Sequence, residues 1–224
     1  VKKIIYISTP SIYYNGKDRY LVREDSILPL KLVNNYARTK RTAEILLEES
    51  NIDFIILRPR AIIGRGDTVI MPRLITAYDK SKLKIIGSGN NIVDLTSVAN
   101  IVHAIILSLR ADKKALNNTY NITDDKPVML WECINTVFKG IGKEVLSSKI
   151  NYYIIFYLAS IMELIAKYIT HTEPSLTKYS VGVLSKSFTL DITKSKKLLK
   201  YEPVITTSKS IEEFINWYKE NEKS

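Results

Sequence analysis

The chain has 224 residues, of which 46% are hydrophobic and 25% are charged, which is ordinary globular usage and enough for one substantial core. Its one cysteine, Cys133, excludes a disulfide within the chain and fits a reducing, cytoplasmic location. The net charge of +10 indicates anionic ligands or surfaces, but the lysines are spread out and lack an interleaved aromatic motif. We therefore expect no nucleic-acid partner; a phosphate-bearing ligand or an anionic membrane surface suits this charge better.

Short apolar runs alternate with amphipathic segments along the chain. Runs such as "KKIIYIS" and "IDFIILRP" are typical of strands buried on both faces, and Pro59 ends the second run. The pattern predicts strands at residues 2–8, 52–59 and 118–123, helices at 35–50, 71–81, 97–111, 129–142 and 210–222, and two short strands around a Gly-Asn turn within 82–96.

This alternation predicts the α/β class, with a partial doubly wound parallel sheet that is Rossmann-like and lacks its first strands, beside a smaller, mostly helical substrate lobe. Residues 1–115 would belong to the sheet domain, with an excursion into the lobe at 60–95, and residues 116–224 mostly to the lobe and the C-terminal helices. The strands are too few for a complete sheet, and the first begins close to Val1. We therefore expect an N-terminal part to precede this chain in the complete protein.

The segment "YYIIFYLASIMELIAKYI", residues 152–169, is almost continuously apolar. Only Glu163 and Lys167 interrupt it, and their spacing of four is that of an exposed helical pair. Two charges disfavour a membrane-spanning helix. The pattern favours a helix packed in the lobe, with a helix that covers a substrate or lies in the plane of a membrane as the alternative.

Tyr36 and Lys40 stand four residues apart near the start of a predicted helix, and so share one face of it. A lysine ammonium beside a tyrosine favours the tyrosinate and lowers the pKa of the phenol, which makes the phenol usable as a proton shuttle. The preceding strand ends in hydroxyl side chains, Ser8, Thr9 and Ser11, which are candidates to hold a substrate oxygen. Ligands of open α/β sheets bind at this edge.

The order of motifs resembles the extended short-chain dehydrogenase/reductase superfamily, the NAD-dependent epimerase/dehydratase family, and within it the 3β-hydroxysteroid dehydrogenase branch. The resemblance extends over nearly the whole chain. It is carried by "STPSIYYNGKDRYLVRED", "NNYARTKRTAE", "LRPRAIIGRGDTVIMPRLI", "IIGSGNNIVDLTSVANIVHAI" and "LTKYSVGVLSKSFTLDITKSKKLLKYEP".

The resemblance implies NAD or NADP as cofactor and assigns roles to single residues. Tyr36 would be the catalytic acid/base, and Lys40 would assist it and hydrogen-bond the nicotinamide ribose. Thr9 matches the catalytic Ser/Thr that holds the substrate oxygen. The remaining implied contacts are those of the loop beside the nicotinamide, Pro59, Arg60, Ala61 and Ile62, and those to the substrate, Ser11, Met71, Leu74 and Val93.

One part of the superfamily pattern is missing from this chain. The Gly-rich turn that holds the cofactor pyrophosphate after the first strand does not occur, because the glycines around Gly64 and Gly87 neither follow a first strand nor open a helix. The chain therefore resembles the C-terminal two-thirds of such an enzyme. We expect the 224-residue chain by itself to bind dinucleotides weakly and to be inactive.

The sequence thus predicts an NAD(P)-dependent oxidoreductase acting on a secondary alcohol or ketone of a hydrophobic substrate such as a sterol, a steroid or a long-chain hydroxy or keto acid. A nucleotide-sugar epimerase or dehydratase is the alternative, and a non-catalytic fragment is the second. The resemblance also suggests a homodimer, and the apolar segment suggests peripheral membrane contact. We expect no metal site, because His103 and His171 stand far apart without nearby carboxylates.

Overall fold

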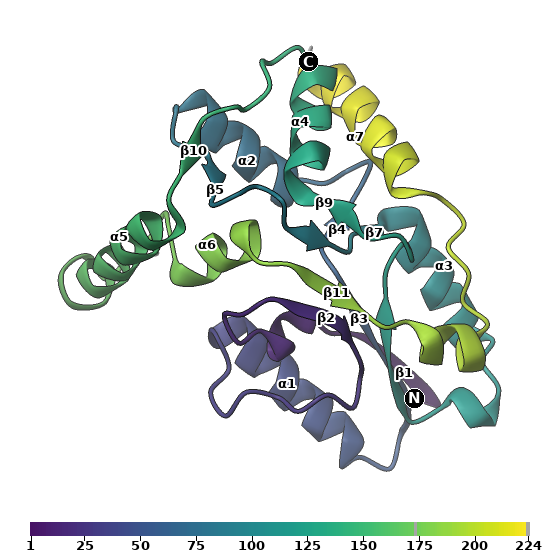
Figure 1. Cartoon of the computed structure of the whole chain (residues 1–224). Coiled ribbons are helices and arrows are strands. Elements are labelled where there is room, and N and C mark those ends of the chain that lie inside the picture. The colour runs from purple at the N-terminus through teal and green to yellow at the C-terminus, as the bar shows by residue number, and fades with distance from the viewer. Residues whose placement is uncertain (173, 223–224) are drawn as a thin grey trace.

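The computed structural model describes residues 1–172 and 174–222. Its centre is a parallel sheet of β1 (Lys3–Ile7), β3 (Asp53–Pro59) and β8 (Asn118–Ile122), in the order β1-β3-β8 (Figure 1). Ile5 pairs with Ile55, and Leu57 with Tyr120. The prediction of parallel strands in an α/β fold is therefore confirmed.

Two helices cover this sheet on opposite sides, as Figure 1 shows for α1 (Asn35–Glu48) and α3 (Val98–Leu109). Alternation along β3 directs Ile55 and Leu57 to one face, where they pack with Ile101 and Ala104 of α3. On the α1 side, Ala37 packs in a cluster with Ile12 and Tyr13 of η1 (Pro10–Tyr13), the short 3₁₀ turn that follows β1. The carboxyl ends of the strands thus lie beside the start of α1.

The second lobe has its own apolar core, built around α2 (Ile70–Asp79), α4 (Leu130–Gly140) and α7 (Thr207–Glu222). Trp131, Ile134 and Phe138 of α4 are nearly inaccessible to solvent within it. The lobe also contains β5 (Ile85–Ile86), paired in parallel with β10 (Lys149–Ile150). These helices lie at the top of Figure 1, above the central sheet.

A small mixed sheet connects the two lobes, with the order β2-β11-β6-β9, formed by Arg19–Val22, Phe188–Leu190, Ile92–Val93 and Val128–Met129. A further pair joins β4 (Ile62–Ile63) to β7 (Thr96–Ser97). The sequence predicted two short strands around a Gly-Asn turn, but β5 and β6 pair with different partners. Both predicted strands are therefore present, and each finds its partners far away along the chain. The helix α6 (Lys178–Ser185) precedes β11.

The division into residues 1–115 and 116–224 stays a proposal, in which β8 would be contributed to the sheet from across the boundary. Three short turns complete the order of elements, namely η2 (Lys113–Ala115), η3 (Ala166–Thr170) and η4 (Ser195–Leu199).

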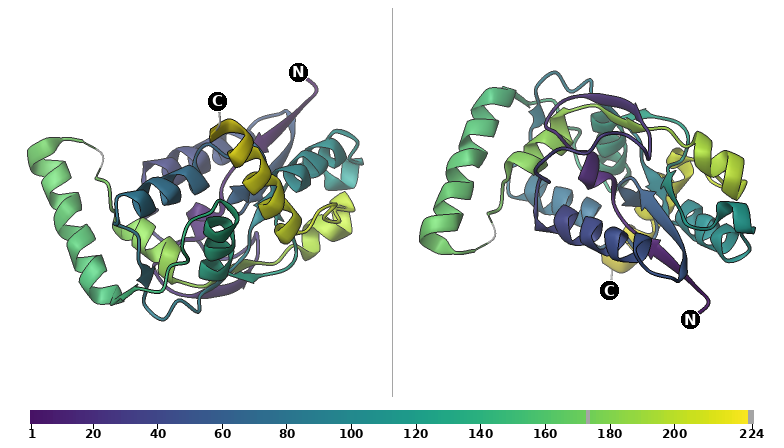
Figure 2. Two further views of the ribbon diagram at one scale, coloured as in Figure 1. Left: turned by 90° about the horizontal axis from the view of Figure 1, so that it is seen from above. Right: turned by 90° about the horizontal axis from the view of Figure 1, so that it is seen from below.

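The apolar segment forms α5 (Tyr152–Ile165), which continues into the π-helical turn η3. Figure 2 shows α5 at the edge of the molecule, with one side facing away from the remaining elements. The combined helix, Tyr152–Thr170, is long and apolar enough to cross a membrane, and only 6% of its most apolar stretch is buried. The favoured prediction of a packed helix is therefore wrong for most of this surface, since among its apolar residues Ala159 and Ala166 are buried while nine large side chains are exposed.

Candidate active site

The residues after β1 form a row of hydroxyl groups. Thr9 caps η1, where its Oγ1 accepts a hydrogen bond from Ser11 N at 3.2 Å and donates one to Ser11 Oγ at 3.0 Å. Ser11 Oγ in turn lies 2.6 Å from the hydroxyl of Tyr179, which comes from α6. Thr9 and Ser11 are buried, so this row is held in a fixed arrangement at the carboxyl edge of the sheet.

Lys40 lies between the end of β1 and Tyr36. Its Nζ donates a hydrogen bond to Ile7 O at 2.7 Å, and lies 4.9 Å from the ring centre of Tyr6 and 5.9 Å from that of Tyr36. Asn34 fixes the start of this helix, because its Oδ1 accepts from Ala37 N at 2.8 Å. Tyr36 is 52% exposed, and its hydroxyl has no hydrogen bond within residues 1–172 and 174–222. The structure thus brings Tyr36, Lys40 and the end of β1 together and leaves the phenol open to a ligand.

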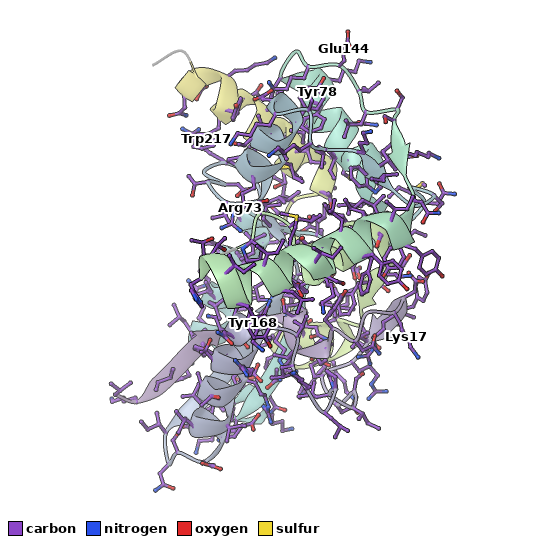
Figure 3. All side chains as sticks on the ribbon, turned by 90° about the vertical axis from the view of Figure 1, so that its left-hand side faces the viewer. Lys17, Arg73, Tyr78, Glu144, Tyr168 and Trp217 are labelled. Carbon is purple, nitrogen blue, oxygen red and sulfur yellow. The ribbon has the colours of Figure 1, made fainter. Side chains whose placement is uncertain are left out.

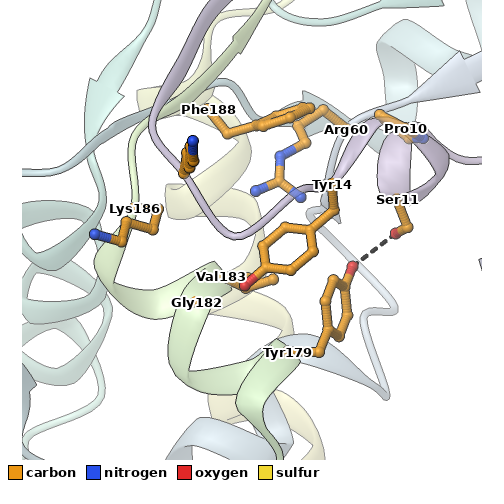
Figure 4. Close-up of a pocket in the computed structure, with 10 residues that line it drawn as sticks. Pro10, Ser11, Tyr14, Arg60, Tyr179, Gly182, Val183, Lys186 and Phe188 are labelled. Atoms are coloured by element: carbon orange, nitrogen blue, oxygen red, sulfur yellow. Dashed lines mark hydrogen bonds between the residues drawn. The ribbon is translucent and has the colours of Figure 1, made fainter. Parts of the chain in front are cut away.

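A small cleft opens beside the hydroxyl row (Figure 4). Tyr14 and Tyr179 meet edge to face along it, with ring centres 5.0 Å apart. Burial raises the pKa of the Tyr14 hydroxyl to about 12, so this phenol remains protonated at neutral pH. The lining comprises Pro10, Ser11, Tyr14, Lys17, Arg60, Tyr179, Gly182, Val183, Lys186 and Phe188.

Arg60 enters this cleft from the loop after β3. Thr96 Oγ1 accepts from Arg60 N at 3.0 Å and is 2.7 Å from Arg60 O, and Arg60 N also donates to Ile122 O at 3.2 Å. The backbone of Arg60 is therefore held at both its N–H and its C=O. In Figure 4 its guanidinium extends toward the space beside Tyr14.

The charged guanidinium of Arg60 lies in an environment that shifts its pKa. Burial lowers the pKa of its guanidinium, and nearby Tyr179 and Asp94 oppose that shift. The guanidinium carbon lies 4.9 Å from the ring centre of Phe188, and Nε is buried without a hydrogen-bond partner. Asp94 itself is buried and accepts from Leu190 N at 2.7 Å, and burial raises the pKa of its carboxyl to about 6.

The other predicted site residues are spread over two environments. Pro59 ends β3, Ala61 adopts the left-handed region with φ 42°, and Ile62 begins β4, so all three adjoin Arg60. The predicted substrate residues Met71 and Val93 are instead buried in the apolar core of the second lobe, and Leu74 packs against it. These three do not line the cleft, whereas Ser11 does.

Sequence reasoning missed Tyr14, Tyr179 and Phe188, which border the cleft. Only Gly182, a glycine inside α6, carried a local signal of close approach, and a Cβ there would come within 2.7 Å of the Tyr14 ring. Within the described ranges no group of three or more His, Cys, Asp or Glu side chains is arranged to hold a metal ion.

Comparison with known proteins gives several relatives over almost the full chain. The 3beta-hydroxysteroid-dehydrogenase/decarboxylase isoform 2 of Arabidopsis thaliana is 35% identical over 96% of this chain and 41% of its own length. The sterol-4-alpha-carboxylate 3-dehydrogenase, decarboxylating, of Mus musculus is 30% identical over 95% of this chain and 62% of its own length. Uncharacterized protein YbjS of Escherichia coli (strain K12) is 31% identical over 100% of this chain and 68% of its own length. The chain thus spans less than two-thirds of the length of the first two of these relatives.

Solved structures share the fold. The UDP-glucuronic acid 4-epimerase from Bacillus cereus in complex with NAD superposes with a TM-score of 0.69 at 23% identity, over 99% of this chain and 62% of that one. The structure of gox2253 superposes with a TM-score of 0.73 at 19% identity, over 99% of this chain and 67% of that one. In sequence, residues 1–152 match the 3-beta hydroxysteroid dehydrogenase/isomerase family. With this match and a relative 31% identical over the whole chain, the chain belongs to the 3-beta hydroxysteroid dehydrogenase/isomerase family.

Proposed function

We propose that the protein containing this chain is an NAD(P)-dependent oxidoreductase that acts on a secondary alcohol or ketone of a hydrophobic substrate. One observation carries this proposal: Lys40 Nζ is fixed by Ile7 O at the end of β1 and stands 5.9 Å from the ring of Tyr36. Tyr36 offers an open phenol that can exchange a proton with a reacting alcohol or ketone, and the ammonium of Lys40 is held beside it.

The residues present fit the nicotinamide-ribose end of a dinucleotide. The ammonium of Lys40 has three donors and uses one on Ile7 O, which leaves donors free for ribose hydroxyls. Pro59, Arg60, Ala61 and Ile62 form the adjoining loop, whose backbone would border the nicotinamide. The cofactor, when bound, supplies the hydride acceptor for oxidation or the hydride donor for reduction.

In this proposal Tyr36 moves the proton of the reacting hydroxyl and Thr9 holds the reacting oxygen. Thr9 suits that role because its hydroxyl is oriented by Ser11 within the hydroxyl row. Ser11 would orient Thr9 and contact the substrate at the mouth of the cleft. The substrate would be enclosed by the second lobe, whose core includes Met71, Leu74 and Val93. These residues would therefore influence the substrate only by supporting that lobe.

The names of two relatives support a steroid or sterol as the substrate class, and an apolar lobe suits such a ligand. A nucleotide-sugar epimerase or dehydratase remains the alternative, since structural neighbours include such enzymes. Homodimer formation through α1 is proposed as well, and the exposed Ile45 and Leu46 on that helix are consistent with it.

The test uses the full-length protein. Tyr36→Phe should lower turnover of a 3β-hydroxysterol by roughly 100-fold or more, because only the proton-transferring hydroxyl is lost. Lys40→Met should lower turnover and also weaken cofactor binding. Tyr20→Phe is the matched control, since Tyr20 is exposed to a similar extent at 60%. Near-normal turnover in Tyr36→Phe, or turnover of UDP-sugars in place of sterols, would contradict the proposal.

We further propose that α5 and η3 rest on a lipid bilayer, which would give the protein a cytoplasmic, membrane-associated location. Tyr153, Tyr157, Ile161, Leu164 and Tyr168 follow the spacing of one helical face, and each is more than half exposed. Figure 3 shows α5 lying across one side of the molecule, with Tyr168 near its end. Tyrosine suits the boundary between headgroups and acyl chains, and the net charge of +10 suits anionic headgroups.

A further inference from the structure

The ammonium of Lys40 is held in place without a carboxylate. Its Nζ donates a hydrogen bond to Ile7 O at 2.7 Å, and no Asp or Glu in the described part of the chain forms an ion pair with it. Glu44, one turn further along α1, pairs instead with Arg58. Within the described residues, two of the three donors of the Lys40 ammonium are therefore left for a ligand.

Tyr6 supplies the nearest aromatic face to this ammonium. The centre of its ring lies 4.9 Å from Lys40 Nζ, whereas the ring centre of Tyr36 lies 5.9 Å away. The face of an aromatic ring attracts a cation within about 6 Å through its quadrupole. This attraction holds the cation without using one of its strong N–H hydrogen bonds on another side chain.

The alternation of β1 places Tyr6 at this position. Ile5 and Ile7 point toward α3, since both pack against the cluster that contains Ile101. Successive side chains of a strand point to opposite faces, so Tyr6 faces α1. Its backbone is fixed by pairing with Ile56 of β3. A residue in the sheet is a rigid support, whereas the four-carbon stem of a lysine is flexible.

The ring of Tyr6, and not its hydroxyl, makes the contact with Lys40. The hydroxyl has no hydrogen bond within the residues that the structure describes. Burial raises the pKa of this phenol above its ordinary value, and the negative charge of Glu44 adds to the shift, so the ring is uncharged at neutral pH. A phenylalanine at this position would therefore keep the contact.

A fixed ammonium matters for the role proposed for Lys40, which is to hydrogen-bond the nicotinamide ribose. A flexible lysine loses rotamer freedom when a ligand orders it, and that loss weakens binding. A lysine that is already held in the right orientation loses less freedom, so the ligand binds more tightly. A carboxylate could also hold the ammonium, but it would occupy the donors that the ribose needs.

We propose that Tyr6 is a positioning residue of the active site, whose ring face holds the ammonium of Lys40 in the orientation that the nicotinamide ribose requires. This inference rests on the function proposed above. Tyr6 acts through Lys40 in this assignment and need not touch the substrate or the cofactor. Loss of the ring should therefore weaken cofactor binding, even though every group proposed to contact the cofactor is still present.

A double-mutant cycle in the full-length protein tests the assignment. The readout is the dissociation constant of NADH or NADPH, whichever the wild type binds more tightly, measured by calorimetric titration. Tyr6→Leu should weaken binding roughly 10-fold, and Tyr6→Phe should stay within about threefold of the wild type. In a Lys40→Met background, Tyr6→Leu should cause no further loss, because its effect passes through the ammonium.

A replacement of matched shape separates the electrons of the ring from its packing. Pentafluorophenylalanine is an aromatic ring of similar shape whose face no longer attracts a cation. Tyr6→pentafluorophenylalanine should therefore weaken cofactor binding about as much as Tyr6→Leu, with a melting temperature close to that of Tyr6→Phe. This comparison decides the question even where Tyr6→Leu fails to fold. Tyr20→Leu is the control, since Tyr20 is 60% exposed outside the cleft, and it should bind the cofactor like the wild type.

Two results overturn the assignment. Equal losses from Tyr6→Leu in the wild-type and Lys40→Met backgrounds show that Tyr6 only packs within the sheet. Equal cofactor binding by Tyr6→Phe and Tyr6→pentafluorophenylalanine shows that the ring face does not hold the ammonium.

Turnover separates this inference from the function on which it rests. If Tyr36→Phe keeps normal turnover, the proposed reaction is wrong, whereas the binding results for Tyr6 stand. If Tyr36→Phe is inactive and Tyr6→Leu binds the cofactor like the wild type, the reaction stands and the role of Tyr6 is wrong.

Discussion

Arg58 and Glu44 form a two-pronged ion pair inside the protein, with Arg58 Nε 2.8 Å from Oε1 of Glu44 and Nη2 2.7 Å from Oε2. The pair connects β3 to α1, the helix that carries Tyr36 and Lys40. Arg58 also donates to the Tyr13 hydroxyl, and Arg41 Nη1 donates to Glu44 at 3.0 Å. Burial raises the pKa of the Glu44 carboxyl, but Arg58 outweighs it and the net shift is downward.

Glu44→Gln should lower the free energy of unfolding by about 3 to 5 kcal/mol, because it leaves the buried Arg58 charge uncompensated. Glu48→Gln is the matched control, since Glu48 also pairs with Arg41 but its side chain is 38% exposed, and it should change stability by about 1 kcal/mol or less. Urea denaturation of both variants measures the two effects.

The stabilising effect of the Glu44 carboxylate should depend on pH. A carboxyl whose pKa is lowered by folding stabilises the protein above its ordinary pKa of 4.5 and ceases to do so as the pH falls through the lowered value. The difference between wild type and Glu44→Gln should therefore shrink as the pH is lowered below about 4.5. A difference that stays constant down to the lowest accessible pH would mean that the ion pair does not carry the effect.

Local sequence patterns were sufficient to predict the main strands and helices of the fold. The runs 2–8 and 52–59 predict strands, and β1 and β3 occupy them as parallel neighbours. The helix predicted at 35–50 is α1, and those at 97–111 and 129–142 are α3 and α4. In each case hydrophobic periodicity and a clear end signal agree with the tertiary environment.

Short strands and the cleft could not be predicted in this way. β2 and β11 pair through residues about 170 positions apart, and no local pattern in either segment specifies the other. Tyr14 and Tyr179 meet for the same reason. Val93 was predicted to contact the substrate but packs in the core. The sequence alone does not distinguish these two environments for an apolar residue in a substrate lobe.

Asp94 predicts a different pH dependence from Glu44. Burial raises the pKa of this carboxyl to about 6 in the folded protein, against an ordinary 3.8, so the folded state binds a proton more tightly than the unfolded state. Stability should therefore fall as the pH rises from about 4 to about 6, by up to about 3 kcal/mol. Asp94→Asn retains an oxygen to accept from Leu190 N but no longer titrates. Thermal unfolding across this pH range should show the fall in wild type and its loss in the variant; parallel curves would contradict the raised pKa.

Gly182→Ala should weaken ligand binding while leaving the stability of the protein almost unchanged. Alanine is the better helix former by about 1 kcal/mol, but its Cβ would collide with the hydroxyl of Tyr14 and lie 2.7 Å from the ring carbon Cζ. The mobile end of Tyr14 can move, so the melting temperature should change little. Because Tyr14 borders the cleft, the affinity for a 3β-hydroxysterol should fall, on the order of 10-fold for a displaced wall. Ser185→Ala at the end of the same helix is the control, and unchanged affinity in Gly182→Ala would mean that Tyr14 does not shape the cleft.

The exposed apolar face of α5 should bind a membrane surface. Burying apolar side chains in a bilayer is favourable, and the exposed Lys167 of η3 is available for anionic headgroups. The full-length protein should therefore sediment with vesicles, more strongly with phosphatidylserine than with phosphatidylcholine alone. The double variant Ile161→Asp/Leu164→Asp should remain in the supernatant with an unchanged melting temperature, because these side chains are 54% and 57% exposed. Val204→Asp, at a 61% exposed position outside α5, should sediment like the wild type. If the wild type instead forms a dimer that the double variant dissolves, without binding vesicles, then a second copy of the chain covers this face and the membrane proposal is wrong.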